Sequence, residues 1–126
     1  MNSDLKIFKC AVCGNTAAVI EDMGIPMMCC GDEMEELSAN SVDAAVEKHV
    51  PVVSESGGAT DVSVGSTAHP MTPEHHIAWI ILTTKQGFQI KYLEKTGDPK
   101  AQFGLSGDDK AAVAYAYCNL HGLWKA

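Results

Sequence analysis

The sequence contains no arginine: all nine basic residues are lysines, and sixteen acidic residues bring the net charge to −7. Arginine is the residue used most for recognising phosphates and nucleic acids, so this acidic chain is a poor candidate for either role. Residues 1–36 carry a balance of −5 and residues 37–126 a balance of −2. If the protein attracts a small anion, a local positive patch must do so against the overall field.

Long apolar runs are missing as well. No stretch approaches the roughly 18 residues that a membrane-spanning helix needs, and the first residues lack the apolar core of a secretory signal. We therefore expect a cytoplasmic protein without membrane association. Disulfides are disfavoured in that compartment, so metal ligation is the expected use of clustered cysteines.

The five cysteines are placed unevenly, with four in the first 30 positions and one near the end. Some 36 residues are too few to enclose a core of their own, and such small units usually need a metal or a covalent staple. We predict a metal-binding knuckle as a first domain, residues 1–37, and a second domain over residues 38–126. The polar stretch 33–43 connects them. The cysteines are Cys10, Cys13, Cys29, Cys30 and Cys118.

Short apolar or alternating segments separated by turn residues make up the chain from about residue 44 onward. Such a pattern predicts an all-β domain, either a sandwich or a small barrel. Residues 111–116 are ambiguous, because their alanines would also suit a helix. The predicted strands cover residues 50–53, 62–64, 77–82, 88–92 and 113–117.

The first domain has the cysteine pattern of a tetrathiolate metal site. Cys10 and Cys13 with the following glycine place two sulfurs in a tight turn, and the second pair completes a set that suits zinc or iron. A structural zinc ribbon is one interpretation. However, zinc ribbons normally repeat the two-residue spacer, whereas Cys29 and Cys30 are adjacent. Adjacent ligands resemble the desulforedoxin module, a small rubredoxin-like Fe(Cys)4 unit.

All five histidines lie in the second domain. Cys118 and His121 are three positions apart, so one loop could present both to one metal. Four imidazoles and a thiolate are too many ligands for tetrahedral zinc. A square of imidazoles with an axial thiolate describes five-coordinate iron with one open face, where the thiolate pushes electron density toward a bound oxygen species. The histidines are His49, His69, His75, His76 and His121.

Three segments of the second domain resemble the signature of superoxide reductases. They are Glu-Lys-His-Val-Pro at 47–51, His-Pro-Met at 69–71 with Glu-His at 74–75, and Cys-Asn-x-His-Gly-x-Trp-Lys at 118–125. Together with the knuckle, the match spans nearly the whole chain in order. The sequence is thus similar to the desulfoferrodoxin family, the superoxide reductases with two iron centres.

The resemblance implies a mainly β fold, with a desulforedoxin-like knuckle followed by an immunoglobulin-like β-sandwich, and two irons per chain without haem or flavin. It assigns Glu47 as the carboxylate that can occupy the sixth position on ferric iron, and Lys48 as the lysine that draws superoxide in. His76 stays outside the site. The implied ligands of the catalytic iron are His49, His69, His75, His121 and axial Cys118.

The implied reaction is the one-electron reduction of superoxide, with two protons, to hydrogen peroxide without release of dioxygen. The resemblance also implies a rubredoxin-like electron donor and a homodimer. Three alternatives stay open on the residues alone: an electron-transfer protein with both irons saturated, a non-enzymatic zinc-binding module, and a dismutase. A dismutase would evolve dioxygen and need no reductant.

Two positions depart from the family pattern. Leu123 stands where many members carry a second histidine after the glycine, and Ala116 where many carry a glutamate. The histidine is not a ligand in the family, so the iron site should survive. Loss of the glutamate changes the field near the thiolate, and we expect it to tune the redox potential rather than to abolish activity.

Overall fold

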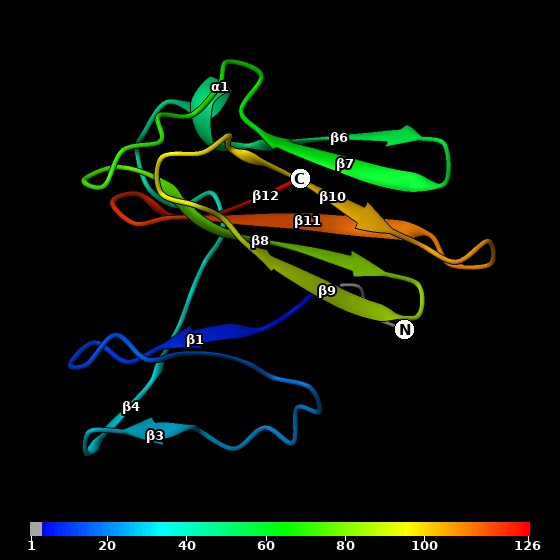
Figure 1. Ribbon diagram of the computed structural model, residues 1–126. Helices are drawn as coiled ribbons and strands as arrows, with labels where there is room; N and C mark the ends of the chain where they lie inside the picture. The colour runs from blue at the N-terminus through cyan, green and yellow to red at the C-terminus, as the bar shows by residue number, and fades with distance from the viewer. Residues whose placement is uncertain (1–3) are drawn as a thin grey trace.

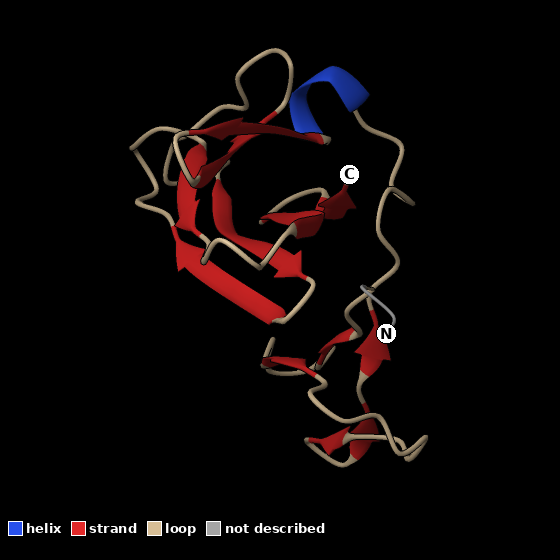
Figure 2. Cartoon of the chain, turned by 90° about the vertical axis from the view of Figure 1, so that its right-hand side faces the viewer, coloured by secondary structure: helices blue, strands red, loops and turns tan. Residues whose placement is uncertain are grey.

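A small N-terminal module of short strands lies below a two-layered β-sandwich, as Figure 1 shows. The structure is a computed structural model and describes residues 4–126. In Figure 2 the helix α1 lies at the end of the sandwich that faces away from the small module. Within the described residues, no helix is long and apolar enough to cross a membrane.

The small module is built from two antiparallel sheets of very short strands. One has the order β2-β1-β5 and the other pairs β3 with β4. The strand β5 lies in the stretch 33–43 that we expected to be a plain connection, and β4 ends at its first residue. The strands are β1 (Ile7–Lys9), β2 (Thr16–Ala18), β3 (Met28–Cys29), β4 (Asp32–Glu33) and β5 (Glu35–Glu36).

The sandwich consists of a sheet of order β10-β7-β6 and a sheet of order β12-β11-β8-β9, with every strand pair antiparallel. The predicted mainly β class, with a cysteine knuckle before a β-sandwich, is confirmed. Its elements are α1 (Val46–His49), β6 (Pro51–Ser56), β7 (Ala59–Val64), β8 (Ile77–Thr84), β9 (Gly87–Tyr92), β10 (Lys100–Gly104), β11 (Ala111–Cys118) and β12 (Gly122–Lys125).

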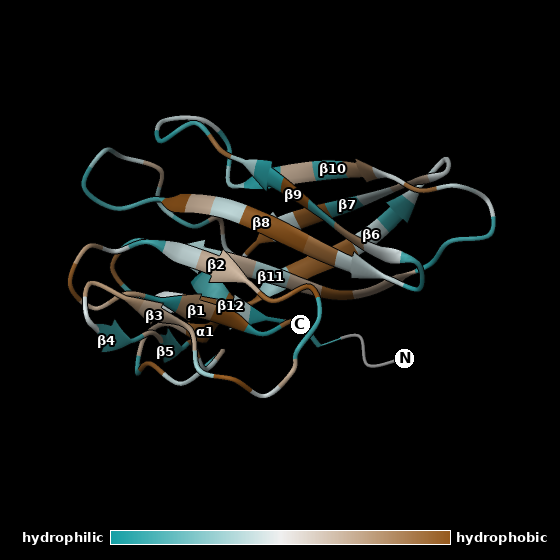
Figure 3. Cartoon of the chain, turned by 90° about the horizontal axis from the view of Figure 1, so that it is seen from below, coloured by the Kyte–Doolittle hydropathy of each residue, from teal (hydrophilic) through white to brown (hydrophobic). Residues whose placement is uncertain are grey.

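The core between the two sheets follows from the alternation of side chains along each strand. Along β7, every second residue is buried, and in Figure 3 the hydrophobic colour runs along β8, where most side chains are buried. The inward side chains of β11 are small, so the β10-β7-β6 sheet can pack close to this strand. Fully buried core residues include Val62, Val64, Ile80, Leu82, Phe103, Ala114 and Ala116.

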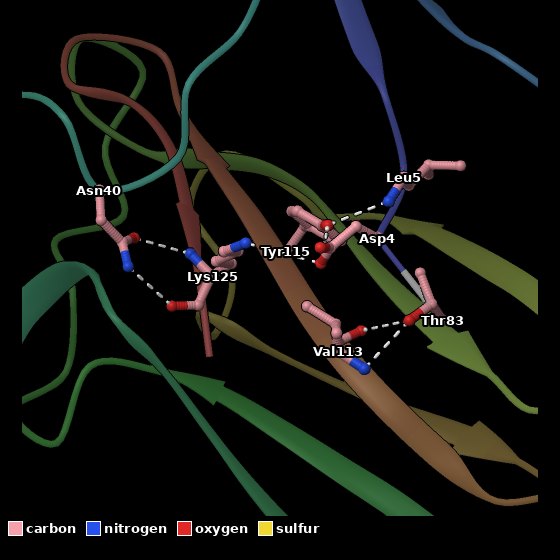
Figure 4. Close-up of polar contacts among 7 residues, drawn as sticks. All are labelled: Asp4, Leu5, Asn40, Thr83, Val113, Tyr115 and Lys125. Atoms are coloured by element: carbon pink, nitrogen blue, oxygen red, sulfur yellow. Dashed lines mark hydrogen bonds and ion pairs between the residues drawn. The ribbon is translucent and has the colours of Figure 1, made fainter. Parts of the chain in front are cut away.

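The ambiguous segment 111–116 is a strand, and tertiary packing explains why. β11 pairs with both β8 and β12, so its backbone groups are satisfied inside the sheet. A bulge lies between Ala111 and Ala114, where the hydroxyl of Thr83 accepts a hydrogen bond from the Val113 amide at 3.0 Å (Figure 4). The strands β10 and β12 and the helix α1 were not predicted, because each is short and has few apolar residues in a clear pattern.

The small module is docked on the outer face of the four-stranded sheet. Ile7 of β1 belongs to one buried cluster with Ile81, Tyr115 and Leu123 of the sandwich. The amide of Leu5 donates to the hydroxyl of Tyr115 at 3.1 Å, as Figure 4 shows. The two parts of the chain therefore share an apolar contact rather than hanging from a free linker.

The connecting segment is tied to the last strand. The side chain of Asn40 accepts from the Lys125 amide at 2.8 Å and donates to the Lys125 carbonyl at 3.1 Å (Figure 4). With these two hydrogen bonds, the Asn40 side chain pairs with the backbone of Lys125 as a neighbouring strand would. The chain between the small module and α1 therefore follows a defined path along the sandwich.

Candidate metal centres

The four cysteines of the small module lie together, with Cys10 buried and Cys13 and Cys30 exposed. Their sulfur atoms are all within 4.8 Å of one another, and none is in a disulfide. The sulfurs of Cys13 and Cys29 are 3.6 Å apart. A tetrahedral ion with sulfurs at roughly 2.3 Å has sulfur–sulfur edges of about 3.8 Å. The spacing of the thiols therefore fits a tetrathiolate metal site.

The backbone of the knuckle explains how adjacent cysteines reach one centre. Cys30 has a positive φ of 53°, and Gly31 after it has a φ of 82°. This left-handed turn brings two neighbouring side chains, which would point apart in a strand, toward the same point. On the other side, the amide of Cys13 donates to the sulfur of Cys10 at 3.5 Å, and Gly14 closes the turn with a φ of 81°.

The thiols of the knuckle do not ionise alike when no cation is present. Hydrogen bonds from the backbone of Cys13 and Val12 lower the pKa of Cys10 to about 6. The pKa of Cys29 is raised to about 12, chiefly by its contacts with the sulfurs of Cys13 and Cys10. A cation among the four sulfurs would favour the thiolate form of all four, which is why metal binding and deprotonation of such a set go together.

A second cluster lies at the end of the sandwich beside α1. It is assembled from the end of α1 (His49), the loop between β7 and β8 (His69 and His75), the end of β11 (Cys118) and the turn before β12 (His121). The donor atoms of His49, His75, His121 and Cys118 all lie within 4.8 Å of one another. The Nε2 atom of His69 is 3.2 Å from that of His49.

The four imidazole rings are arranged as the corners of a square. His49 Nε2 lies 3.1 Å from His121 Nδ1, close to the separation of about 3.0 Å expected for neighbouring nitrogens that share one ion at roughly 2.1 Å. Neighbouring ring centroids are 4.6 to 5.1 Å apart in the order His49, His69, His75, His121. His49 and His75, at 6.3 Å, are opposite each other.

Hydrogen bonds on the outer side of the square set the tautomers of two rings. The Nδ1 of His49 is 2.7 Å from the carbonyl of Ala45, and the Nδ1 of His69 is 2.7 Å from that of Pro70. A carbonyl accepts only, so each Nδ1 carries the proton and each Nε2 presents a lone pair inward. Backbone carbonyls thereby prepare both rings as metal ligands.

His75 has a buried ring nitrogen whose hydrogen-bonding capacity is not used within residues 4–126. Its Nε2 is buried and, among the described residues, makes no hydrogen bond. Leaving a buried polar atom unpaired costs about 1–3 kcal/mol, so such an atom needs an explanation. Burial also lowers the pKa of His75, and it lowers the pKa of His69 to about 4. Both rings are neutral at neutral pH, which is the form that binds a metal.

Cys118 completes the cluster from inside the sandwich. Its side chain is fully buried, and its sulfur accepts a hydrogen bond from the His121 amide at 3.4 Å. The sulfur lies 3.9 Å from His121 Nδ1. Four nitrogens in a square with a sulfur on the buried side form a donor set that fits five-coordinate iron better than tetrahedral zinc.

The charged residues at the cluster lie on α1. Glu47 and Lys48 are exposed, and the charge of Lys48 contributes to lowering the pKa of His75, after burial and the neighbouring histidines. His76 is buried beside the cluster, with Nδ1 3.0 Å from the carbonyl of Thr72, and is not among the residues whose donor atoms converge.

Three residues that support the cluster were not singled out from the sequence. The Trp124 ring stacks on His49 with centroids 4.8 Å apart and donates through Nε1 to the His121 carbonyl at 3.1 Å. Asn119 accepts from the His76 amide at 2.8 Å, which ties the loop of His75 to the turn after Cys118. Trp124 and Asn119 could have been predicted to support the cluster, because both lie inside the Cys-Asn-x-His-Gly-x-Trp segment.

Gly65 is the third of these residues. A Cβ atom at this position would meet the Glu47 carbonyl at 2.8 Å and would also overlap the carbonyl of Thr67. With a φ of 86°, Gly65 lets the turn after β7 close against α1. Its signal in the sequence was weak, because a single glycine after a predicted strand marks most turns.

Comparison with known proteins gives matches along the whole chain. The family model described as "Desulfoferrodoxin" matches residues 41–126, and that described as "Desulfoferrodoxin, N-terminal domain" matches residues 2–37. The desulfoferrodoxin of Clostridium acetobutylicum is 43% identical over 126 residues, which is 100% of this chain and 98% of that protein. The superoxide reductase of Thermococcus kodakarensis is 40% identical over 97 residues, or 63% of this chain and 84% of that protein.

A solved structure extends the similarity to three dimensions. The crystal structure of the superoxide reductase from Treponema pallidum has a TM-score of 0.83 and 41% sequence identity, and the match covers 98% of both chains. The similarity therefore includes the small module and the sandwich together.

Proposed function

The chain belongs to the desulfoferrodoxin family, and from this premise we propose how its residues carry out superoxide reduction. The protein is a superoxide reductase, an oxidoreductase that converts superoxide and two protons to hydrogen peroxide with one electron and without releasing dioxygen. The observation that carries this function is the square of four imidazoles above one buried cysteine. Its cofactors are two iron ions per chain, one for the four-cysteine set and one for the histidine–cysteine set.

We propose that the four cysteines of the small module hold one iron and that four histidines and Cys118 hold the other, and the contacts support this assignment. The sulfur spacing of 3.6 Å and the nitrogen spacings of 3.1 and 3.2 Å suit ions of the usual bond lengths. Iron supplies the one-electron exchange when bound. The first set is Cys10, Cys13, Cys29 and Cys30, and the second is His49, His69, His75, His121 and Cys118.

We assign Lys48 the task of drawing superoxide to the site. The net charge of −7 disfavours an approaching anion, so a positive side chain next to His75 provides local attraction. Lys48 also orients the water that delivers protons to the product. Glu47, the preceding residue of α1, would supply a carboxylate to the iron in its oxidised state.

We further propose a cytoplasmic homodimer that is reduced by a rubredoxin-like protein, with domain limits at residues 1–37 and 38–126. Exposed apolar side chains around the knuckle support a protein contact there, since such groups rarely gather on a surface without a partner. Cys13 and Cys30 are exposed as well, which shortens the path for an incoming electron. The apolar side chains are Val12, Ile20, Met23, Ile25 and Met28.

The test of the function is anaerobic mixing of the reduced, iron-loaded protein with superoxide. We expect one hydrogen peroxide for each catalytic iron oxidised and no dioxygen. Release of dioxygen without a reductant would instead identify a dismutase. Metal analysis should find two irons per chain. Azide added to the oxidised protein should change its visible spectrum, whereas a saturated electron-transfer site would stay unchanged.

A further inference from the structure

We propose that Lys9 of the small module is a positioning residue for the Cys118 thiolate and acts through Tyr117. The inference rests on the proposed role of Cys118 as the axial ligand of the catalytic iron. It gives the small module an effect on the catalytic centre that requires no electron to pass between the two sites.

A single side-chain contact joins the neighbours of two ligands. The Nζ atom of Lys9 donates to the hydroxyl of Tyr117 at 2.7 Å, and it lies 5.1 Å from the centre of the Tyr117 ring. Lys9 immediately precedes Cys10, and Tyr117 immediately precedes Cys118. The contact therefore links the backbone at one metal set to the backbone at the other across 108 positions of sequence.

The ladder between β11 and β8 is irregular at the point where Tyr117 is followed by Cys118. Tyr117 pairs with Trp79, but Cys118 pairs with Ile77, so β8 has one extra residue, Ala78. Bulges of this kind change the direction of a side chain and are frequent beside active sites. Here the bulge decides how the sulfur of Cys118 is aimed at the histidine square.

Tyr117 is held firmly on the outer side of this bulge. Its ring stacks on that of Trp79, with centroids 5.2 Å apart and planes 11° from parallel. Successive residues of a strand point to opposite faces, so Tyr117 faces the small module while Cys118 faces the core. The stack and the bond from Lys9 together restrain the backbone that carries the thiolate.

Tyr115 provides an internal comparison, because it belongs to the same docking surface but lies before the bulge. Its hydroxyl accepts a hydrogen bond from the Leu5 amide at 3.1 Å and donates one to Asp4 Oδ1 at 3.4 Å (Figure 4). Loss of the Tyr115 hydroxyl weakens docking without touching the Tyr117 contact. Lys6 is the matching control for Lys9. It is a lysine of the same module, but its exposed ion pair with Asp22, at 2.6 Å, stays within that module.

When the Lys9 contact is removed, Tyr117 gains freedom and the bulge can relax. The Cys118 sulfur is then aligned less well with the iron position, and the thiolate donates less electron density to the iron. Ferric iron loses more than ferrous iron from this change, so the midpoint potential of the catalytic site rises and its sulfur-to-iron absorption band shifts.

The experiment compares iron-loaded Lys9→Met and Tyr117→Phe with the matched controls Lys6→Met and Tyr115→Phe. Redox titration and the position of the sulfur-to-iron band are the readouts. We expect both test variants to shift the potential upward and the band in a common direction, and both controls to match the parent protein. Lys9→Arg keeps a donor for the Tyr117 hydroxyl, so it should restore most of the parent values.

The double variant Lys9→Met/Tyr117→Phe separates a shared contact from two independent effects. If the two residues act through one contact, the double variant shifts no further than either single variant. Shifts that add would overturn the proposal, since Lys9 would then act through its own charge. An equal shift in Tyr115→Phe would also overturn it, because docking in general would be responsible.

A Cys118→Ser variant distinguishes failure of this inference from failure of the proposed function. If Cys118→Ser loses the sulfur-to-iron band while Lys9→Met and Tyr117→Phe match the parent, the ligand role stands and the positioning role is wrong. If Cys118→Ser keeps the band, the ligand role itself is wrong, and the positioning role falls with it.

Discussion

The unpaired Nε2 of His75 shows at the scale of one residue how the catalytic cluster is prepared. The atom is buried and has no hydrogen bond to any residue that the structure describes, while the rings of His49 and His69 are oriented by the carbonyls of Ala45 and Pro70. These bonds hold two lone pairs inward before a metal arrives. Residues that never touch the metal therefore contribute to its geometry.

Lys48 gives the first prediction at this scale. Replacing Lys48 by Ile should slow second-order capture of superoxide about tenfold, because electrostatic steering of a small anion is worth factors of this order. The dependence of the rate on ionic strength should weaken at the same time, since salt screens the lost attraction. Stopped-flow mixing with pulsed superoxide measures both.

The matched control is Lys91→Ile on the exposed strand β9, which changes the net charge by the same amount. This variant should capture superoxide at nearly the parental rate. If the two variants are slowed equally, the overall charge and not the position of Lys48 controls capture, and the assignment of Lys48 is wrong.

At the scale of elements, the site depends on how short segments meet. The helix α1 has four residues and no side-chain cap, so it is held by its surroundings rather than by its own hydrogen bonds. The turn after β7 supplies that support: the Thr67 amide donates to the Glu47 carbonyl at 2.9 Å. Gly65 makes this approach possible.

We therefore expect Gly65→Ala to lower the free energy of unfolding by about 1–3 kcal/mol, from the strain of a positive φ together with overpacking. Because the variant displaces α1, the catalytic iron should also be lost faster to a chelator. Urea denaturation and the rate of iron release measure the two effects.

Gly58→Ala is the control, because Gly58 has nearly the same φ, 85° against 86°, but open space where a Cβ would lie. It should show the backbone strain alone, about 1 kcal/mol, and normal iron release. Equal losses in both variants would mean that the close approach to α1 has no energetic role.

At the scale of the whole molecule, one strand serves both metal sets: β11 carries Cys118 and also the surface on which the module with the other set is docked. β11 presents Tyr115 and Tyr117 to the small module on one face, and Ala114, Ala116 and Cys118 to the core on the other. Docking of the module and placement of the thiolate thus depend on the same backbone. The absence of a glutamate at Ala116 leaves this inner face apolar, and we expect a tuned potential rather than an inactive enzyme.

The metal-free protein should lose stability as the pH falls from about 6.5 toward 4. The folded pKa of His69 is about 4, because of burial, whereas the ordinary value is 6.5. Between these values the unfolded chain binds a proton that the folded chain does not, so unfolding becomes easier as pH decreases. Urea denaturation of the chelated protein at pH 7, 6 and 5 measures the trend.

A His69→Gln variant should reduce the slope of this dependence, because it removes one of the groups that take up a proton on unfolding; His75 and Cys10, whose pKa values are also lowered, keep the remainder. The neutral amide leaves the net charge at pH 7 unchanged. If the metal-free parent and His69→Gln show the same slope between pH 7 and 5, burial of His69 does not control the acid sensitivity.

Residue types and spacing by themselves predicted a four-cysteine metal set and a second set of imidazoles with one cysteine, and the family resemblance chose which histidines belong to the second. The adjacent pair Cys29-Cys30 and the segment around Cys118 and His121 limit the possible ligands, because thiolates and imidazoles have few other uses in such patterns. Alternating apolar segments likewise predicted the all-β class, since their period of two survives in the folded strands, but they left a sandwich and a small barrel both open.

Only the tertiary structure decided the order of the rings around the square, the support of α1 by Gly65 and the contact of Lys9 with Tyr117. Each of these joins residues that are far apart in sequence, and their distance in space depends on how sheets and loops pack. The segment 111–116 became a strand for the same reason: its alanines allow either structure, and pairing with β8 and β12 selects one.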